Sequence, residues 1–410
     1  MTLSYRIAMP GQVWSVAVPD PSGPLYVTSY GASPLETVVT MLDLSGSVVW
    51  QRTYAGTGRP QSRLSDDGTL WVAYPMQAGR VLEGVLPDGT THHRVVPESQ
   101  VGEELSAFVL LEDGFCIAWA STSRLLRMSE GEQPASSQPR VARYTWEGDC
   151  VWSTPVVLGA VSHPGVIGMG VETGRQVRAL RPWIPQEVAA DRWEPLLVSG
   201  DRVAASFTDE RSGIGSTCFL DLADGSIVSA TPPAPAGRKA IAGPGEFLIG
   251  SQGYGAFTTS LHGRDGSATA RWASHGAMVV DGRGVICGPE LENRLPSRSL
   301  FRRLAPGNTL SDGPPLTGYY TSYPAMDREG TTVFWRDGKL IAVDRGLDAH
   351  ELFAMNDDRK VMGRTLLLGD GRVVVSLDSE VLAFQTSLGP LAEGPWPCGD
   401  ANLLGNPVLR

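Results

Sequence analysis

Glycine-containing turns recur along this chain at a nearly constant interval, and this period constrains the fold more than any other feature. Eight glycines each precede a short run of strand-forming residues: Gly23, Gly68, Gly114, Gly200, Gly245, Gly284, Gly330 and Gly371. The intervals between them are 45, 46, 86, 45, 39, 46 and 41 residues, so one doubled interval interrupts a regular series. Four-stranded β-propeller blades repeat at about this spacing. The period therefore predicts an all-β chain that forms one eight-bladed β-propeller over residues 1–410.

A second series of turns indicates how many strands each blade contains. Five further glycines stand in short polar turns, 21 to 34 residues after a glycine of the first series: Gly46, Gly89, Gly148, Gly225 and Gly266. Two turn glycines per repeat predict four-stranded blades, with the first series leading into the second strand. The last repeat holds only three strands, whereas residues 3–9 form a spare strand. We expect this strand to pair with the eighth blade and close the ring.

Composition and charge narrow the classes of partner and compartment. Charged residues make up only 19% of the chain, which favours many turns over long solvated helices. The net charge of −10 does not attract phosphates, so we expect no nucleic-acid partner. The N-terminus lacks an apolar stretch long enough for a signal peptide or a membrane span. Five scattered cysteines form no CxxC pair, and together these features predict a cytoplasmic protein with no membrane partner.

The C-terminal residues carry a pattern of their own: Leu391-Ala392, Pro395-Trp396-Pro397, Asn402 and Gly405-Asn406. This pattern resembles the terminal motif of the PQQ-like β-propeller family, with Gly394 and Leu404 in place of a serine and a threonine of that motif. Asp43, Gly46 and Trp50 resemble the blade motif of the same family. The resemblance implies an eight-bladed propeller but not the quinone, and we expect no cofactor. Residues 388–410 are expected to form a C-terminal cap segment.

Two insertions interrupt the repeats, at about residues 122–139 within blade three and at residues 158–195 between blades three and four. In a propeller, the loops between second and third strands leave the same face as the connections between blades. Long loops on a rigid scaffold concentrate binding residues. We therefore expect the functional surface on this face, over blades three and four.

The insertion at residues 158–195 is rich in arginine and tryptophan, which are enriched at binding hot spots. The candidate binding residues are Arg175, Arg178, Arg181, Trp183, Arg192 and Trp193. Alternatively, the tryptophans pack the insertion onto the ring and the arginines are ordinary solvated charges. No nucleophile elbow, P-loop or metalloprotease motif occurs in a supporting context. The first hypothesis is therefore a non-catalytic scaffold that binds a protein through these loops.

A second hypothesis is a biosynthetic enzyme of the lyase or isomerase type, with an acid–base pocket at the mouth of the central channel on the same face. Its candidate catalytic residues are His163, Glu172, Asp209, Glu210 and Arg211, of which Arg211 would hold an anion. A third hypothesis is a small-ligand sensor, which an apolar pocket without convergent titratable groups would favour. The histidines show no recognised ligand spacing, so no metal site is predicted.

Overall fold

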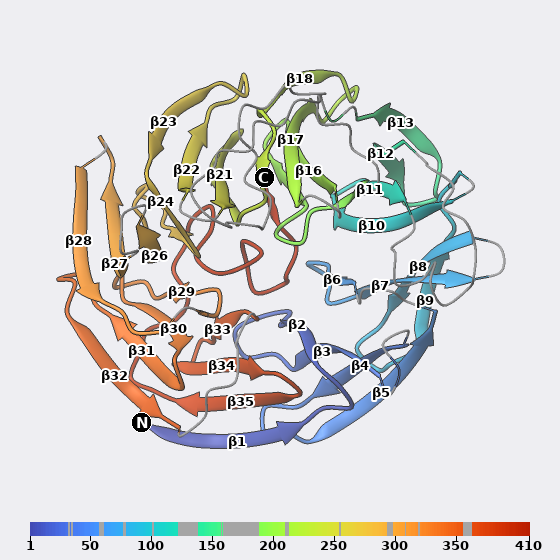
Figure 1. Cartoon of the computed structure of the whole chain (residues 1–410). Helices are drawn as coiled ribbons and strands as arrows, with labels where there is room; N and C mark the ends of the chain where they lie inside the picture. Colours follow the sequence, from blue (N-terminus) through green and yellow to red (C-terminus); the bar gives the residue numbers. More distant parts are fainter. Residues whose placement is uncertain are drawn as a thin grey trace, which may run out of the picture.

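The structure is a computed structural model that describes residues 1–31, 33, 36–56, 61–76, 79–100, 102–121, 138–156, 158, 188–209, 213–253, 256–292, 298–307, 309–318, 320–355 and 363–410. These residues form strands, turns and bends, and none of them lies in a helix. The strands within these ranges make eight sheets, in which neighbouring strands are antiparallel apart from one short parallel pair. Figure 1 shows the sheets around a common centre, with successive strands of a sheet lying further out. This is the arrangement of a β-propeller.

The sheets are called blades one to eight in chain order, and their strands run from the centre outward. Blade one contains β2 (Val13–Ala17), β3 (Leu25–Tyr30), β4 (Glu36–Leu42) and β5 (Val48–Ala55); blade two contains β6 (Ser62–Leu64), β7 (Leu70–Met76), β8 (Gly79–Val85) and β9 (Thr91–Val95). Blade three contains β10 (Glu103–Leu110), β11 (Gly114–Ser121), β12 (Arg140–Thr145) and β13 (Cys150–Pro155). Blade five contains β20 (Lys239–Gly243), β21 (Glu246–Gly253), β22 (Ala256–His262) and β23 (Ala268–Trp272). Blade seven contains β29 (Ala325–Met326), β30 (Thr332–Arg336), β31 (Lys339–Val343) and β32 (Ala349–Ala354).

Blades four and six have broken inner strands. In blade four, β14 (Val188–Ala190) and β15 (Leu196–Ser199) both pair with β16 (Arg202–Asp209), while β18 (Ile227–Ala230) and β19 (Ala234–Pro235) both pair with β17 (Ile214–Asp221). In blade six, β24 (Ser274–Gly276) and β25 (Val279–Val280) both pair with β26 (Ile286–Glu292), followed by β27 (Arg298–Ala305) and β28 (Thr309–Pro315). The break in blade four leaves residues 191–195 between two strand segments.

The second strands lie where the glycine turns predict them. β3, β7, β11, β16, β21, β26, β30 and β34 (Arg372–Leu377) each begin within two residues of a glycine of the first series. The five glycines of the second series lie between third and fourth strands and have φ between +73° and +93°. Glycine reaches this left-handed region without steric cost, which explains its use at these turns. The positions of the second strands, and of the turns between third and fourth strands, therefore agree with those expected from the two glycine series.

The outer strand of blade eight comes from the start of the chain. β1 (Thr2–Ala8) pairs antiparallel with β35 (Glu380–Gln385), from Thr2 opposite Gln385 to Ala8 opposite Glu380. β35 pairs in turn with β34, and β34 pairs with β33 (Thr365–Leu367). Figure 1 shows β1 outside β35 and β34. The first and last parts of the chain therefore meet in one sheet.

The tail, residues 386–410, crosses the downstream ends of the inner strands. Backbone bonds join Val18 to Leu403, Leu64 to Leu404, Val280 to Trp396 and Met326 to Pro397. The Asn406 side chain makes two bonds to the Leu110 backbone, of 3.0 and 2.9 Å, and β36 (Val408–Leu409) pairs in parallel with β15. The tail is thus bonded to blades one to four, six and seven. It lies in the middle of the ring in Figure 1.

Apolar side chains fill the spaces between neighbouring blades. Trp71 of blade two packs in one cluster with Phe115 and Trp119 of blade three. Cys116 of blade three packs in another with Phe207 of blade four. Removing a buried aromatic side chain from such a cluster costs about 3–5 kcal/mol. This packing makes the inner strands a firm support for the residues that face the channel.

Candidate functional site

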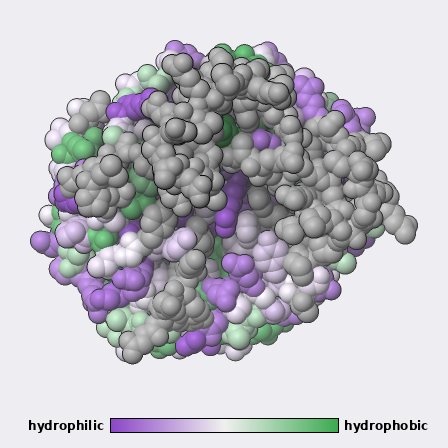
Figure 2. Space-filling view, viewed as in Figure 1, coloured by the Kyte–Doolittle hydropathy of each residue, from purple (hydrophilic) through white to green (hydrophobic). Residues whose placement is uncertain are grey.

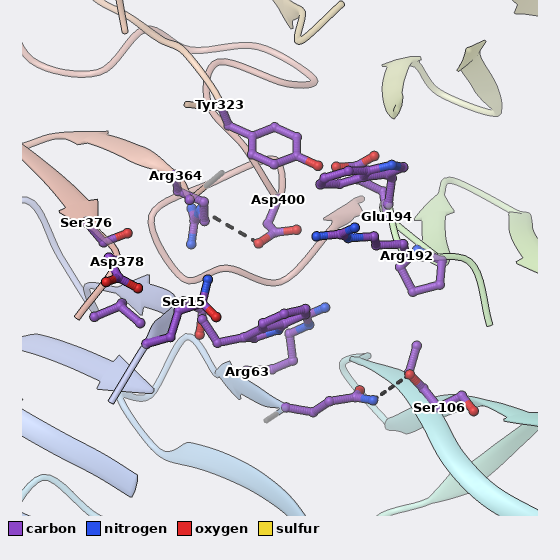
Figure 3. A pocket seen from close by; sticks show the side chains of 18 residues that line it. Ser15, Arg63, Ser106, Arg192, Glu194, Tyr323, Arg364, Ser376, Asp378 and Asp400 are labelled. Atoms are coloured by element: carbon purple, nitrogen blue, oxygen red, sulfur yellow. Dashed lines mark hydrogen bonds and ion pairs between the residues drawn. The ribbon is translucent and has the colours of Figure 1, made fainter. Parts of the chain in front are cut away.

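A cavity of about 160 Å³ lies at the centre of the ring. Blades one to four, seven and eight line it together with the tail. Its polar lining residues include Ser15, Arg63, Ser106, Arg192, Glu194, Tyr323, Arg364, Ser376, Asp378 and Asp400. Figure 3 shows these side chains converging from different blades. Figure 2 shows hydrophilic residues in the hollow at the centre of the ring.

The cavity and most of the tail lie at opposite ends of the inner strands. The cavity is lined by Val13 at the start of β2 and by Gln61 just before β6. The tail instead bonds to Val18 and Leu64, at the ends of the same two strands. Asp400 of the tail reaches the cavity. The tail therefore forms the floor of the cavity, and described residues at the starts of the inner strands surround its mouth.

Residues 191–195 bulge from blade four into this mouth, and Lys239 at the start of β20 holds the bulge. The Lys239 ammonium lies 2.7 Å from an Asp191 carboxylate oxygen, 2.8 Å from the Trp193 carbonyl oxygen and 3.0 Å from the Gly237 carbonyl oxygen. Lys239 and Asp191 are both buried. Three acceptors satisfy all three donors of the ammonium group, so this ion pair fixes the bulge against blade five.

Glu194 lies at the top of the bulge with φ of +39°, an uncommon conformation for a residue with a side chain. Its carboxylate accepts a 2.8 Å hydrogen bond from the Lys239 backbone N–H, and the residue is 7% exposed. Burial raises the pKa of this carboxyl group from 4.5 to about 8. Arg238 and Lys239 oppose the rise, and Asp400 adds to it. A buried acid with a raised pKa in a cleft is typical of functional sites.

Arg238 lies between the aromatic rings of two residues that line the cavity. Its guanidinium carbon is 4.8 Å from the centroid of the Trp193 ring and 3.8 Å from that of the Tyr323 ring. Burial lowers the pKa of this guanidinium to about 10, an effect that Glu194 opposes. Arg238 Nη1 is buried and has no hydrogen-bond partner in the described ranges. Arg192 lies over the same Trp193 ring, at 4.9 Å, and is exposed.

Two further arginines face Asp400 across the floor. Arg364 donates to the Val16 carbonyl at 2.9 Å and to the Asn402 carbonyl, and its Nε lies 3.7 Å from Asp400 Oδ2. Arg63 donates through Nε to the Phe108 carbonyl at 3.2 Å. Burial lowers the pKa of Arg63, Asp400 opposes this, and Arg364 adds to it. Asp400 is therefore electrostatically coupled to Glu194 and Arg63, and it is ion-paired to Arg364.

The site thus contains three carboxyl groups, those of Glu194, Asp378 and Asp400, and the surroundings of Glu194 and Asp400 differ. Glu194 is buried and favours its neutral form at neutral pH. Asp400 lies beside the cationic Arg364. A neutral carboxylic acid and a second carboxyl group in one cavity can divide the roles of acid and base. The arrangement is chemically capable of proton transfer to a molecule in the mouth.

Of the candidate residues from the sequence, Arg192 and Trp193 line this cavity. Asp209 is buried at the end of β16, where its carbonyl accepts a 2.8 Å hydrogen bond from Gly213, and it does not line the cavity. The other candidates lie outside the described residues: His163, Glu172, Arg175, Arg178, Arg181, Trp183, Glu210 and Arg211. Residues 188–190, which the sequence places in the insertion, form β14 of blade four.

Several residues of the site were not found from the sequence: Arg63, Glu194, Tyr323, Arg364 and Asp400. Glu194 directly follows the candidate Trp193, and it precedes a proline, which restricts its backbone. Arg63 is a charged residue in the middle of a short inner strand, a position that is usually apolar. Asp400 lies within the C-terminal pattern itself. These signals identify unusual residues, but they do not bring blades two, four and eight together.

Two general properties concern the described residues as a whole. Their side chains include no group of three or more metal-ligating residues. Within the same ranges, no helical segment is long and apolar enough for a membrane crossing.

No known protein family and no curated protein matches the sequence. Solved structures of similar shape include the WD40 β-propeller domain of Doa1, at 10% identity and a TM-score of 0.46, covering 94% of this chain and 97% of that one. A streptogramin B lyase has 10% identity and a TM-score of 0.44, covering 92% and 96% of the two chains. Virginiamycin B lyase from Staphylococcus aureus has 10% identity and a TM-score of 0.45, covering 93% and 98%. Similarity at this level does not extend to function.

Proposed function

We propose that this chain is a closed eight-bladed, PQQ-like propeller of the cytoplasm that binds a small molecule at the mouth of its central channel. The eight sheets and the pairing of β1 with β35 support the closed ring. The tail's contacts across the ring support its role as a cap. All five cysteines are unpaired, which suits a reducing compartment.

The chemistry that the mouth supports best is proton transfer, as in a lyase or an isomerase. The carrying observation is Glu194, a buried carboxyl group on a fixed bulge, whose pKa of about 8 suits an acid at neutral pH. Asp400 supplies a second carboxylate on the floor of the same cavity. Glu194 and Asp400 are not among the catalytic candidates chosen from the sequence. The proposed site is nevertheless at the mouth of the central channel, where the hypothesis of a lyase or isomerase expects its pocket.

A fragment screen by ligand-observed NMR tests binding in the mouth. Ser106 lines the cavity and is half-buried, so Ser106→Trp is expected to fill it and abolish binding of the fragments that the unmodified chain binds. Thr309→Trp, on the exposed outer strand of blade six, is the matched control and is expected to leave binding intact. Fragments that bind equally to both variants would count against the site, as would the absence of any bound fragment.

Proton transfer has a readout that requires no knowledge of the product. In D2O, a bound fragment with an acidic C–H bond is expected to exchange that hydrogen faster than in free solution. Glu194→Gln is expected to lose the acceleration and keep binding, because glutamine retains an acceptor for the Lys239 N–H but cannot donate a titratable proton. Unchanged exchange in this variant would remove the acid–base role.

A protein-binding scaffold is the second candidate. It is favoured by Arg192, which is exposed beside Trp193 at the rim, since arginine and tryptophan are the commonest hot-spot residues. Loops over blades three and four would supply the rest of that surface. Cross-linking in cell extract, with the full chain and with residues 159–187 deleted, is expected to lose a partner on deletion. An identical set of partners would exclude this surface.

A further inference from the structure

Two arginine side chains, Arg63 and Arg192, offer positively charged hydrogen-bond donors at the channel mouth. Arg192 is exposed, lies over the Trp193 ring, and is close enough to Arg238 to lower the pKa of that guanidinium. Arg63 uses Nε and Nη1 for the carbonyl groups of Phe108 and Ser62, which leaves the rest of its guanidinium facing the cavity. Figure 3 shows Arg63 and Arg192 on different sides of the space around Asp400. Such a pair can receive an anion from two directions.

Three carboxyl groups line the same space, those of Glu194, Asp378 and Asp400, and Asp378 is exposed. Asp400 lies beside Arg364. Glu194 is buried, and ionising it places a negative charge close to the position that an anionic ligand would occupy. The protonation state of Glu194 therefore determines how strongly the mouth attracts an anion.

The charged groups around Glu194 come from four parts of the chain. Arg238 and Lys239 lie at the start of blade five, and Asp400 faces Glu194 from the tail. Arg192 and Asp191 belong to the bulge itself. His275 of β24 accepts a 3.0 Å hydrogen bond from the Arg238 backbone, and burial lowers its pKa to about 3. His275 is thus neutral at physiological pH. Glu194, with a pKa of about 8, titrates in this cluster before Arg238, whose pKa is about 10.

We infer that the channel mouth takes up a small organic anion together with a proton on Glu194. This inference rests on the proposed small-molecule site and adds the charge class of the ligand and its proton linkage. When Glu194 is ionised, one proton enters with each anion, the carboxylate becomes a neutral carboxylic acid, and no covalent bond changes. When Glu194 is already protonated, the anion binds alone.

The size and walls of the cavity restrict the anion further. A water molecule needs about 10–15 Å³ of cavity volume. The cavity of 160 Å³ therefore accommodates a ligand with on the order of ten non-hydrogen atoms. Trp14, Trp193 and Tyr323 line the same space. Aromatic walls with flanking guanidinium groups suit a flat ring that carries a carboxylate. Benzoate is therefore a suitable probe, with benzamide as its neutral counterpart and benzylamine as its cationic one.

Titration calorimetry with these three probes from pH 6.5 to 9.5 tests the inference. Benzoate is expected to bind at least tenfold more tightly than benzamide or benzylamine at pH 7. Its affinity is expected to stay flat below pH 7 and to fall up to tenfold per pH unit above pH 8, because deprotonated Glu194 must first regain its proton. Glu194→Gln is expected to make the profile flat, whereas Glu112→Gln, on an exposed turn, is expected to keep it.

Two further measurements make the result decisive. Benzoate binding at pH 8.5 in buffers of different ionisation enthalpy is expected to show proton uptake in the unmodified chain, which needs no folded variant. Arg192→Ala is expected to weaken benzoate binding about tenfold and to leave benzamide binding nearly unchanged, since it removes an exposed cation and one contact with Trp193 but no wall of the cavity. Equal affinities for benzoate and benzamide overturn the anion class, and a pH-independent affinity without proton uptake overturns the linkage. Neutral fragments that bind in the mouth when benzoate does not would refute this inference alone, whereas loss of every ligand would refute the proposed function.

Discussion

Replacing Glu194 with glutamine is expected to stabilise the chain at alkaline pH and to change little in acid. In the folded chain, burial raises the pKa of this carboxyl group from 4.5 to about 8. Each pH unit corresponds to about 1.4 kcal/mol, so ionisation costs the folded state roughly 5 kcal/mol relative to the unfolded state. The protonated carboxyl group contributes fully to the free energy of unfolding below pH 4.5. This contribution falls as the pH rises and is lost above pH 8. Glutamine does not ionise and therefore avoids this loss.

The assay is the difference in Tm between the unmodified chain and Glu194→Gln, measured at the same scan rate from pH 5 to pH 9. Unfolding entropy of about 2.1 cal/mol/K per residue gives about 0.9 kcal/mol/K for a chain of 410 residues. The variant is thus expected to gain about 5 °C over the unmodified chain across this range. Taking the difference cancels the pH dependence of all other groups, and Glu112→Gln controls for loss of an exposed carboxylate.

A difference that does not change with pH would refute the reasoning, because it would mean that Glu194 ionises as easily in the folded chain as in the unfolded one. A change of the opposite sign, with the variant losing stability at high pH, would show that ionised Glu194 is stabilised by Arg238 and Lys239 more than burial penalises it. Either result would also remove the basis for Glu194 as an acid at neutral pH.

Three other perturbations test the frame around the site. Lys239→Met removes the cation that is ion-paired with the buried Asp191 carboxylate and is expected to cost about 3–5 kcal/mol in chemical denaturation, whereas Lys339→Met, in the exposed pair with Glu351, is expected to cost less than about 1 kcal/mol; similar losses would contradict the assigned burial. Asn406→Ala leaves the Leu110 N–H and carbonyl groups without partners and is expected to cost about 2–5 kcal/mol, so a loss near zero would show that the tail is weakly held. Cys150 is exposed and the other four cysteines are buried, so one thiol is expected to react with a disulfide reagent in the folded chain and five after denaturation; rapid reaction of several thiols would mean that the blades open.

The fold was predictable because its signals are local and repeated. A turn glycine followed by a strand recurs in every blade, and each repeat adds independent support to the same period. The spare strand at residues 3–9 follows from counting strands, and β1 lies in that place. Burial of the second strands follows from their apolar composition and from having a neighbouring blade on each side.

The site was less predictable because it depends on how several blades meet. Arg192 and Trp193 were selected for their residue types, and both line the cavity. Arg63 and Asp400 are separated by hundreds of residues, and nothing in the spacing of the sequence indicates that they face the same cavity. Glu194 depends on the break between β14 and β15, which a regular inner strand would not contain. The period of the turn glycines predicts a ring of blades. Irregularities within single blades, such as the break between β14 and β15, determine which side chains enter the centre of that ring.

The tail links the stability of the ring to the chemistry of its mouth. It bonds to the downstream ends of the inner strands and carries Asp400 into the floor of the cavity. A ligand in the mouth therefore rests on a segment whose position depends on contacts with distant blades, such as the pair of bonds between Asn406 and Leu110. Loosening the tail is expected to weaken both folding and binding, whereas the loss of Arg192 at the rim weakens binding alone. The two variants thus separate the floor of the site, which the fold requires, from the rim, which it does not.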